Sequence, residues 1–287
     1  MLLVDTSSDF SWIASPPVKS NGFKPTYLQR DVLCRMYRQH ELTGQLFTAT
    51  MQLGRTGVEG FRFLSATIVM PAMELIDGLD GSLGLAPSGL DTFWDQGGCK
   101  RPGSESTFAL SIEHTTRESA EIRCQRSWEL MGNEGFTAFN LASRDRWSMF
   151  VDNITMGGVT LCDRNCEVSF ELGLVNAFFP EAYSGIISLI WNVDFHWDFN
   201  TFVLQRTALT RYAAVSITVE DLVFTWPTQE HAYDHTTPLG ERVLLSSIRF
   251  HDKKYFALGT DFLHRIKLRM KSGRPDYLEV AKNSRFG

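Results

Sequence analysis

The strongest constraint on the fold is a series of runs rich in β-branched and aromatic residues that recur along the chain. Two of these runs, residues 45–53 and 61–69, are bounded by glycine and predict a pair of neighbouring strands. Further runs of this kind lie at residues 147–151, 154–156, 214–219, 222–226 and 243–250. Only residues 26–38 and 179–190 favour a helix, and both are too short to suggest a helical bundle or βαβ units. The sequence therefore predicts an all-β fold.

The length of the chain predicts two β lobes. With 287 residues the chain is long enough to build two separate hydrophobic cores. The polar stretch at residues 140–146 is the best candidate for the join between them. We therefore expect an N-terminal lobe at residues 1–140 and a C-terminal lobe at residues 141–287.

Charge and hydropathy exclude several partners. The chain has 28 Lys and Arg against 33 Asp and Glu, and no basic run follows a phosphate backbone, so we expect no nucleic-acid partner. The most apolar stretch, residues 185–191, is far shorter than the roughly 20 residues that cross a bilayer. We expect a soluble monomer without a membrane partner. The N-terminus lacks the pattern of a secretory signal, which predicts a cytoplasmic protein if this N-terminus is natural and a secreted one if it was trimmed.

The common motifs for cofactors and metals are missing. The chain has no phosphate loop, no dinucleotide fingerprint, no Gly-x-Ser-x-Gly elbow and no His-Glu-x-x-His, so we expect no cofactor and no metal. Residues 231–235 hold two histidines and an aspartate, but nothing in the spacing places both rings on one face. We favour a solvated loop between strands over a metal site there.

Five cysteines leave at least one outside any intrachain disulfide. Cys162 and Cys166 have a spacing that permits a small disulfide loop but lack the further ligands of a zinc site. A structural disulfide or two plain thiols are therefore favoured over a metal. The other three cysteines show no spacing pattern.

One segment near the N-terminus carries a chemical pattern. Residues 3–13, with the sequence LVDTSSDFSWI, place Asp5 on a turn after an apolar strand, follow it with hydroxyl residues and close with a tryptophan. This resembles the first catalytic motif of the pepsin-like aspartic peptidases. Further family landmarks recur in order at residues 80–86 (DGSLGLA), 152–158 (DNITMGG) and 255–263 (YFALGTDFL). The resemblance covers residues 4–280 and implies a bilobal fold with a cleft between two β lobes.

The resemblance assigns roles to further residues. Tyr37, seven residues before a glycine, resembles the tyrosine at the tip of the family's flap hairpin, and Arg38 and His40 would then lie on the flap over the cleft. Cys162 and Cys166 fall where pepsins have a small disulfide. The chain starts four residues before Asp5, so we expect the first strands of the family fold to be missing.

The second catalytic motif departs from the family pattern. Where the family has Asp-Thr-Gly, this chain has Glu171-Leu172-Gly173. The added methylene moves the second carboxylate by ~1.5 Å, and a misplacement of about 1 Å can cost roughly 100-fold in rate. In the family each motif's threonine braces the opposite loop, which Thr6 can still do and Leu172 cannot. Ser8 keeps a hydroxyl beside the first acid.

The environments predict different roles for the two acids. Asp5 keeps hydroxyl neighbours, which favour the ionised form, so we expect it to be the base. Glu171 has the apolar neighbours Phe170, Leu172, Leu174 and Val175, and desolvation should raise its pKa and make it the proton donor.

Three functions compete. The first is acid–base chemistry by Asp5 and Glu171 on a small organic molecule, such as cyclisation, dehydration or isomerisation, as in secondary metabolism. The second is an aspartic endopeptidase with an unusual Asp/Glu dyad. The third is a non-catalytic relative that binds a ligand or a protein in the cleft. We favour the first, with a small molecule or a peptide as the ligand.

Overall fold

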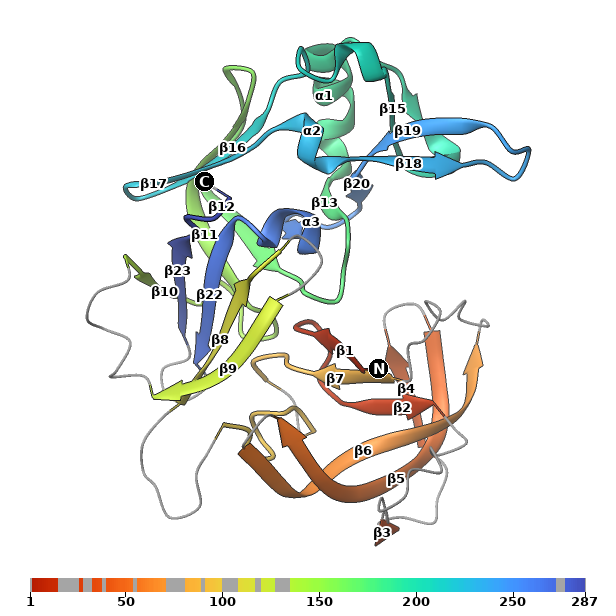
Figure 1. The fold of residues 1–287 in the computed structure, drawn as a ribbon, viewed down its shortest axis with the longest axis vertical. Helices are drawn as coiled ribbons and strands as arrows, with labels where there is room; N and C mark the ends of the chain where they lie inside the picture. Colours follow the sequence, from red (N-terminus) through yellow and green to blue (C-terminus); the bar gives the residue numbers. More distant parts are fainter. Residues whose placement is uncertain are drawn as a thin grey trace.

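The computed structural model describes residues 2–14, 26–27, 33–37, 40–53, 56–70, 81–88, 91–99, 108–116, 120–126, 135–271 and 277–286. These residues form four β-sheets connected by short helices and loops (Figure 1). The prediction of an all-β fold is therefore confirmed. Among these residues, no helix combines the length and the apolar character needed to cross a membrane.

The first sheet, at the lower right of Figure 1, is built from residues 2–84. Its strands run in the order β1-β7-β2-β6-β5-β3, and β4 also pairs with β5. Their bounds are β1 (Leu2–Asp5), β2 (Trp12–Ala14), β3 (Thr26–Tyr27), β4 (Leu33–Tyr37), β5 (His40–Leu53), β6 (Thr56–Met70) and β7 (Gly81–Gly84). The strand pair predicted at residues 45–53 and 61–69 is confirmed, because β5 and β6 are antiparallel neighbours with Phe47 opposite Phe63.

The helix predicted at residues 26–38 is wrong. The described part of this segment forms β3 and β4, and both pair with β5. Local helical preference is weak, and the cross-strand contacts offered by the long β5 override it.

The second sheet carries seven strands in the order β17-β16-β11-β12-β21-β13-β20. Their bounds are β11 (Ser148–Met156), β12 (Val159–Phe170), β13 (Ala177–Pro180), β16 (Val215–Val219), β17 (Leu222–Trp226), β20 (Ile248–His251) and β21 (Phe256–Leu258). The runs at 147–151 and 154–156 belong to one strand, β11, which has a register shift between Val151 and Asn153. The runs at 214–219 and 222–226 form the antiparallel hairpin β16–β17.

The helix predicted at residues 179–190 is confirmed over its second half. Helix α1 (Ser184–Trp191) follows a 3₁₀ turn, η2 (Glu181–Tyr183). The preceding residues pair as β13 with β20, and Pro180 favours an extended residue before it, so the helix starts later than the pattern suggests.

The other two sheets have five and four strands, in the orders β10-β23-β22-β8-β9 and β14-β15-β19-β18. Their strands are β8 (Phe108–His114), β9 (Ala120–Arg126), β10 (Thr137–Asn140), β14 (Phe195–His196), β15 (Thr201–Leu204), β18 (Ala232–Thr236), β19 (Arg242–Ser246), β22 (Ile266–Lys271) and β23 (Tyr277–Lys282). Short helices complete the chain: η3 (Trp197–Phe199), η4 (Arg206–Ala208), α2 (Thr228–His231) and α3 (Thr260–Leu263). The five-stranded sheet combines strands from before and after residue 140.

Two local predictions in this part are wrong. The run at 243–250 divides into β19 and β20, which lie in different sheets, because the amide and the hydroxyl of Ser247 both donate to the carbonyl of His231. Residues 231–235 are not a solvated loop: His231 ends α2 and is buried, and the next residues form β18. Pairing with β19 and packing of the His231 ring between tryptophans account for this order.

Tryptophans tie the first half of the chain to the second. The indole nitrogens of Trp94 and Trp147 both donate to the carbonyl of Leu85, at 3.0 and 2.5 Å. Their rings meet edge to face with centroids 5.7 Å apart, and Trp147 is fully buried. Burial of two large rings around one shared acceptor fixes the start of β11 against the segment after β7.

Two disulfides close loops in the chain. Cys162 and Cys166 are bonded within β12, and Cys99 is bonded to Cys124 on β9. The second bond joins residues 25 positions apart, and no local spacing pattern reveals such a pair.

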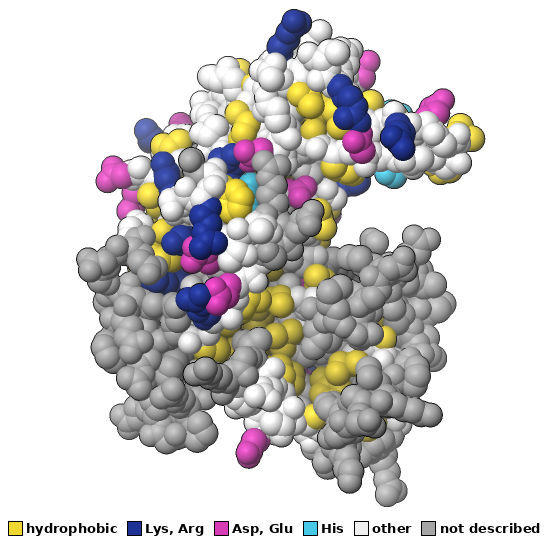
Figure 2. Space-filling model, in the orientation of Figure 1, with side chains coloured by type: hydrophobic (Ala, Val, Ile, Leu, Met, Phe, Trp, Pro, Cys, Tyr) yellow, Lys and Arg dark blue, Asp and Glu magenta, His cyan; other side chains and the backbone are white. Residues whose placement is uncertain are grey.

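Charges of both signs lie side by side on the face shown in Figure 2, so its described residues form no large area of one sign. Elsewhere in the described residues, exposed charges of opposite sign also pair, as in Lys253 with Asp252 at 3.2 Å. Exposed pairs of this kind contribute little to stability.

We predict that acid destabilises the fold through His231. Burial lowers the pKa of His231 to about 3, whereas an unfolded histidine titrates near 6.5. A lowered folded-state pKa favours the neutral form, so this stability is present above pH 6.5 and is lost as the pH falls below it. At pH 4 we expect a loss of about 3 kcal/mol relative to pH 7, measured by denaturant unfolding.

His231→Phe should reduce this pH dependence, because a phenyl ring keeps the stacking on Trp191 and cannot be protonated. His196→Phe, on an exposed strand, is the control and should leave the pH dependence unchanged. Equal free energies of unfolding at pH 4 and pH 7 in the wild type would contradict the prediction.

We also predict one thiol per chain. The two disulfides use four of the five cysteines and leave Cys34. Thiol titration of the denatured, unreduced protein should therefore give about one group per chain, and all five after reduction. Three thiols before reduction would show that one of the two bonds does not form.

Candidate functional site

A single hydroxyl joins the turn that follows β1 to the turn that follows β12. The Thr6 hydroxyl donates to the carbonyl oxygen of Phe170 at 2.7 Å and accepts from the amide of Leu172 at 3.0 Å. Glu171 lies between these two residues, and Asp5 directly precedes Thr6. The structure thus brings together the two turns that carry the predicted acids, although they are more than 160 residues apart in the chain.

Asp5 is fully buried at the end of β1. Its Oδ1 accepts from the amide of Ser7 at 2.9 Å and from the hydroxyl of Ser7 at 2.7 Å. The predicted neighbour Ser8 acts differently: its hydroxyl donates to the carbonyl of Phe10 at 2.7 Å and shapes the turn. The hydroxyl donor to Asp5 is therefore Ser7.

Glu171 is almost buried, with 9% of its surface exposed. Its amide donates to the carbonyl of Leu258 at 2.9 Å, and its Oε1 accepts from the Ser169 hydroxyl at 3.2 Å. The expected apolar neighbours contribute unequally, because Leu172 is buried whereas Val175 is 56% exposed. The surroundings of Glu171 are more polar than the sequence suggested.

The sequence motif does not include Ser169, which precedes the acid. A signal was available, since residues two apart in a strand point to the same face. Ser169 is the residue two positions before Glu171, on the strand that leads to it. This alternation predicts a hydroxyl beside the glutamate.

A charged group links Tyr255 to the strand that leads to Glu171. The Arg146 guanidinium carbon is 4.2 Å from the centroid of the Tyr255 ring, and Arg146 also pairs with Glu167 at 3.5 Å. Glu167 accepts from the Ser148 hydroxyl at 2.8 Å. Burial raises the pKa of Tyr255, and the negative charge of Glu171 raises it further. The carboxylate of Glu171 and the phenol of Tyr255 therefore act on each other electrostatically.

The predicted flap residues are placed only in part. The backbones of Tyr37 and His40 are opposite each other at the end of the β4–β5 hairpin. Arg38 lies outside the described residues. The residues between Tyr37 and His40 lie outside the described part of the chain, and the roles of Tyr37, Arg38 and His40 in a flap stay predictions.

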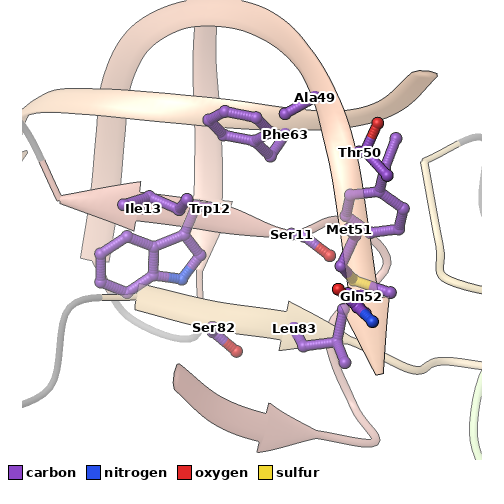
Figure 3. A pocket seen from close by; sticks show the side chains of 11 residues that line it. Ser11, Trp12, Ile13, Ala49, Thr50, Met51, Gln52, Phe63, Ser82 and Leu83 are labelled. Atoms are coloured by element: carbon purple, nitrogen blue, oxygen red, sulfur yellow. The ribbon is translucent and has the colours of Figure 1, made fainter. Parts of the chain in front are cut away.

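A small apolar pocket of about 230 Å³ lies on the first sheet. Figure 3 shows its lining, which comes from β5, β6 and β7 and from the segment that includes β2. Ile13, Met51, Phe63 and Leu83 supply much of its apolar surface. The pocket adjoins the Asp5 strand, because the Ser11 hydroxyl on its wall accepts from the amide of Gly84, the partner of Asp5. None of its described lining residues is a carboxylate, so the described lining offers an apolar surface and no acid or base.

Among the described residues, no group of three or more His, Cys, Asp or Glu side chains is arranged to hold a metal ion. What the site offers is two buried carboxylates, each with its own hydroxyl donor. Carboxylates in such positions can accept and donate protons.

We predict that the Thr6 hydroxyl is needed for stability. Thr6→Val keeps the shape of the side chain but takes away a hydrogen-bond partner from two buried backbone groups. We expect a loss of roughly 2–4 kcal/mol, measured by denaturant unfolding, and faster hydrogen exchange at the Leu172 amide. Thr6→Ser retains the hydroxyl and should stay within about 1 kcal/mol of the wild type. If Thr6→Val had the wild-type free energy of unfolding and the wild-type hydrogen-exchange rate at the Leu172 amide, the two Thr6 hydrogen bonds would contribute nothing to stability.

Comparison with known proteins adds no relative: no protein-family model matches the chain, and no curated protein matches it either.

Proposed function

We propose that the chain has a pepsin-like aspartic peptidase fold, with two lobes that repeat one strand arrangement. In the first half β1 is parallel to β7, β7 is antiparallel to β2, and β2 is parallel to β6. In the second half β12, β21, β13 and β20 follow the same sequence of parallel, antiparallel and parallel pairs. Asp5 ends β1, and Glu171 directly follows β12, so the two acids occupy equivalent places.

Two glycines support this equivalence. A Cβ atom on Gly84 would lie 2.4 Å from the carbonyl oxygen of Phe10, and one on Gly259 would lie 2.3 Å from that of Asn176. Phe10 is five residues after Asp5, and Asn176 is five residues after Glu171. In both halves the turn after the acid packs onto a glycine of the neighbouring strand, where no side chain fits.

We further propose that Asp5 and Glu171 carry out acid–base chemistry on a small organic molecule. The observation that carries this proposal is the Thr6 bridge, because it holds the turn of one buried carboxylate against the turn of the other. Cyclisation, dehydration and isomerisation all need one group to remove a proton and another to supply one. A pair of acids with different surroundings suits this division.

The hydrogen bonds favour Asp5 as the base. Two donors from Ser7 meet one oxygen of Asp5, and such donors stabilise a carboxylate that has lost its proton. Glu171 accepts from the Ser169 hydroxyl, which can rotate and instead accept a hydrogen bond from the protonated acid. Glu171 is therefore proposed as the group that delivers a proton.

The same contacts argue against a peptidase that works in acid. In such a peptidase the two carboxylates would have to share one proton. Their spacing would then depend on each acid's turn being braced by a side chain from the other turn. Here Thr6 braces the second turn, but Leu172 has no hydroxyl with which to brace the first. Buried, neutral histidines also destabilise the fold in acid. An endopeptidase remains the second candidate because both positions keep an acid.

The two disulfides bear on where this chemistry takes place. Such bonds persist in oxidising compartments and are rare in the cytosol. We propose that the protein is secreted or resides in an oxidising compartment, as a monomer with a small molecule or a peptide as its ligand.

We predict that Asp5→Asn and Glu171→Gln each lower turnover by on the order of 100-fold or more, the usual scale for a general acid or base. The protein is incubated near neutral pH with a small-molecule extract of the cells that produce it, and masses are compared before and after. Isomerisation or cyclisation leaves the mass unchanged and shifts the retention time, whereas dehydration gives a product one water lighter.

Asp9→Asn is the matched control, because Asp9 lies on the same turn as Asp5 and is exposed. It should convert the same compound at the wild-type rate. Conversion at the wild-type rate by both Asp5→Asn and Glu171→Gln would refute the proposal. Cleavage of a denatured protein at acid pH that pepstatin blocks would favour the endopeptidase instead.

A further inference from the structure

Tyr255 directly precedes β21, the strand beside β12. Strand β21 runs parallel to β12 with Phe256 beside Val168 and Ala257 beside Ser169. Residues two apart along a strand share a face, so Glu167 and Ser169 form one row on β12, and Glu171 comes just after the end of that strand. Arg146 contacts both Glu167 of this row and the Tyr255 ring.

Two neighbours hold the Tyr255 ring. The Arg146 guanidinium covers it at 4.2 Å, and the His251 ring meets it edge to face at 5.2 Å. Arg146 is held in turn by Asp145 at 2.9 Å and Glu167 at 3.5 Å. A phenol fixed in this way presents its hydroxyl in one direction.

The Tyr255 hydroxyl has no hydrogen-bond partner among the described residues, although the side chain is only partly exposed. Its raised pKa keeps the phenol protonated at neutral pH, so it can donate a hydrogen bond. An uncommitted donor on a fixed ring beside a buried carboxylate is available to a bound molecule.

We propose that Tyr255 is a further ligand-contacting residue of the site, donating a hydrogen bond to an oxygen of the bound molecule beside the atom that Glu171 protonates. The inference rests on the proposed function and extends it: it assigns as substrate a compound whose reacting centre carries a carbonyl, hydroxyl or ether oxygen. Arg146 is the positioning residue behind the ring.

Titration of the Tyr255 phenol tests its place beside Glu171 without a substrate. Four charged groups act on it: Glu171, Glu167 and Asp145 raise its pKa, and Arg146 lowers it. Glu171→Gln should therefore lower the pKa of Tyr255, and Arg146→Gln should raise it. We would incorporate fluorotyrosine at the seven tyrosines and follow each phenol by ¹⁹F NMR.

Fluorine lowers the pKa of a phenol, so the titration is complete at a milder pH. Tyr255→Phe identifies the resonance. Tyr277 is the internal control, because its raised pKa arises from burial and from Glu279, and it should not respond to Glu171→Gln. An unchanged Tyr255 pKa in Glu171→Gln would overturn the inference.

A kinetic measurement tests the contact with the bound molecule. With the compound that the wild-type protein converts in the mass comparison, Tyr255→Phe should lower kcat/KM roughly 10-fold or more, and Tyr277→Phe should leave it unchanged. Equal kcat/KM in wild type and Tyr255→Phe would overturn the inference while leaving the proposed function intact. The opposite result would refute the proposed function and not the inference. In that result the Tyr255 pKa shifts in Glu171→Gln, but Asp5→Asn and Glu171→Gln both convert the compound at the wild-type rate.

Discussion

The Thr6 hydroxyl is the contact on which the candidate site depends. It fills two roles at once, as donor to the Phe170 carbonyl and as acceptor from the Leu172 amide. All three residues are almost completely buried, so water cannot replace the lost partner. One side chain therefore fixes the turn of Glu171 against the turn of Asp5. With Leu172 in the equivalent place of the second turn, the reverse hydrogen bond cannot be made by a side chain, and the bracing is one-sided.

One-sided bracing suits two acids that work separately better than two that share a proton. A shared proton needs both carboxylates to hold one precise spacing. Asp5 is instead held by Ser7 and Glu171 by Ser169, each within two residues of its acid. The longer side chain of glutamate is anchored to its own strand by this hydroxyl. Each acid thus has a hydroxyl donor on its own segment of the chain.

Strands were predicted well where the pattern was local and the partner was near in the chain. β5 and β6 are adjacent runs with strong β preference, and so are β16 and β17. The helix expected at residues 26–38 failed because pairing with β5 decides the structure of that segment. The Cys99–Cys124 bond joins segments that only the folded chain brings together, so spacing could not reveal it.

The site was predictable to a similar degree. Asp5, Thr6 and Glu171 follow from motif order, and the structure places their turns in contact. The structure shows that Ser7, and not Ser8, donates its hydroxyl to Asp5. Which of two neighbouring serines does so depends on the geometry of the turn, and residue types alone do not determine that geometry. The Arg146–Tyr255 contact joins residues more than 100 positions apart, through the pairing of β12 with β21. These details follow from tertiary packing, which the sequence pattern alone does not specify.

Buried histidines connect the fold to the pH at which the site can work. His231 lies between Trp191 and Trp226, and burial also lowers the pKa of His114 and His251. Each must gain a proton when the chain unfolds below pH 6.5, so acid favours the unfolded state. Chemistry that needs a protonated dyad at low pH would have to operate at a pH where these histidines destabilise the fold. Acid–base work near neutral pH, as we propose for Asp5 and Glu171, avoids that conflict.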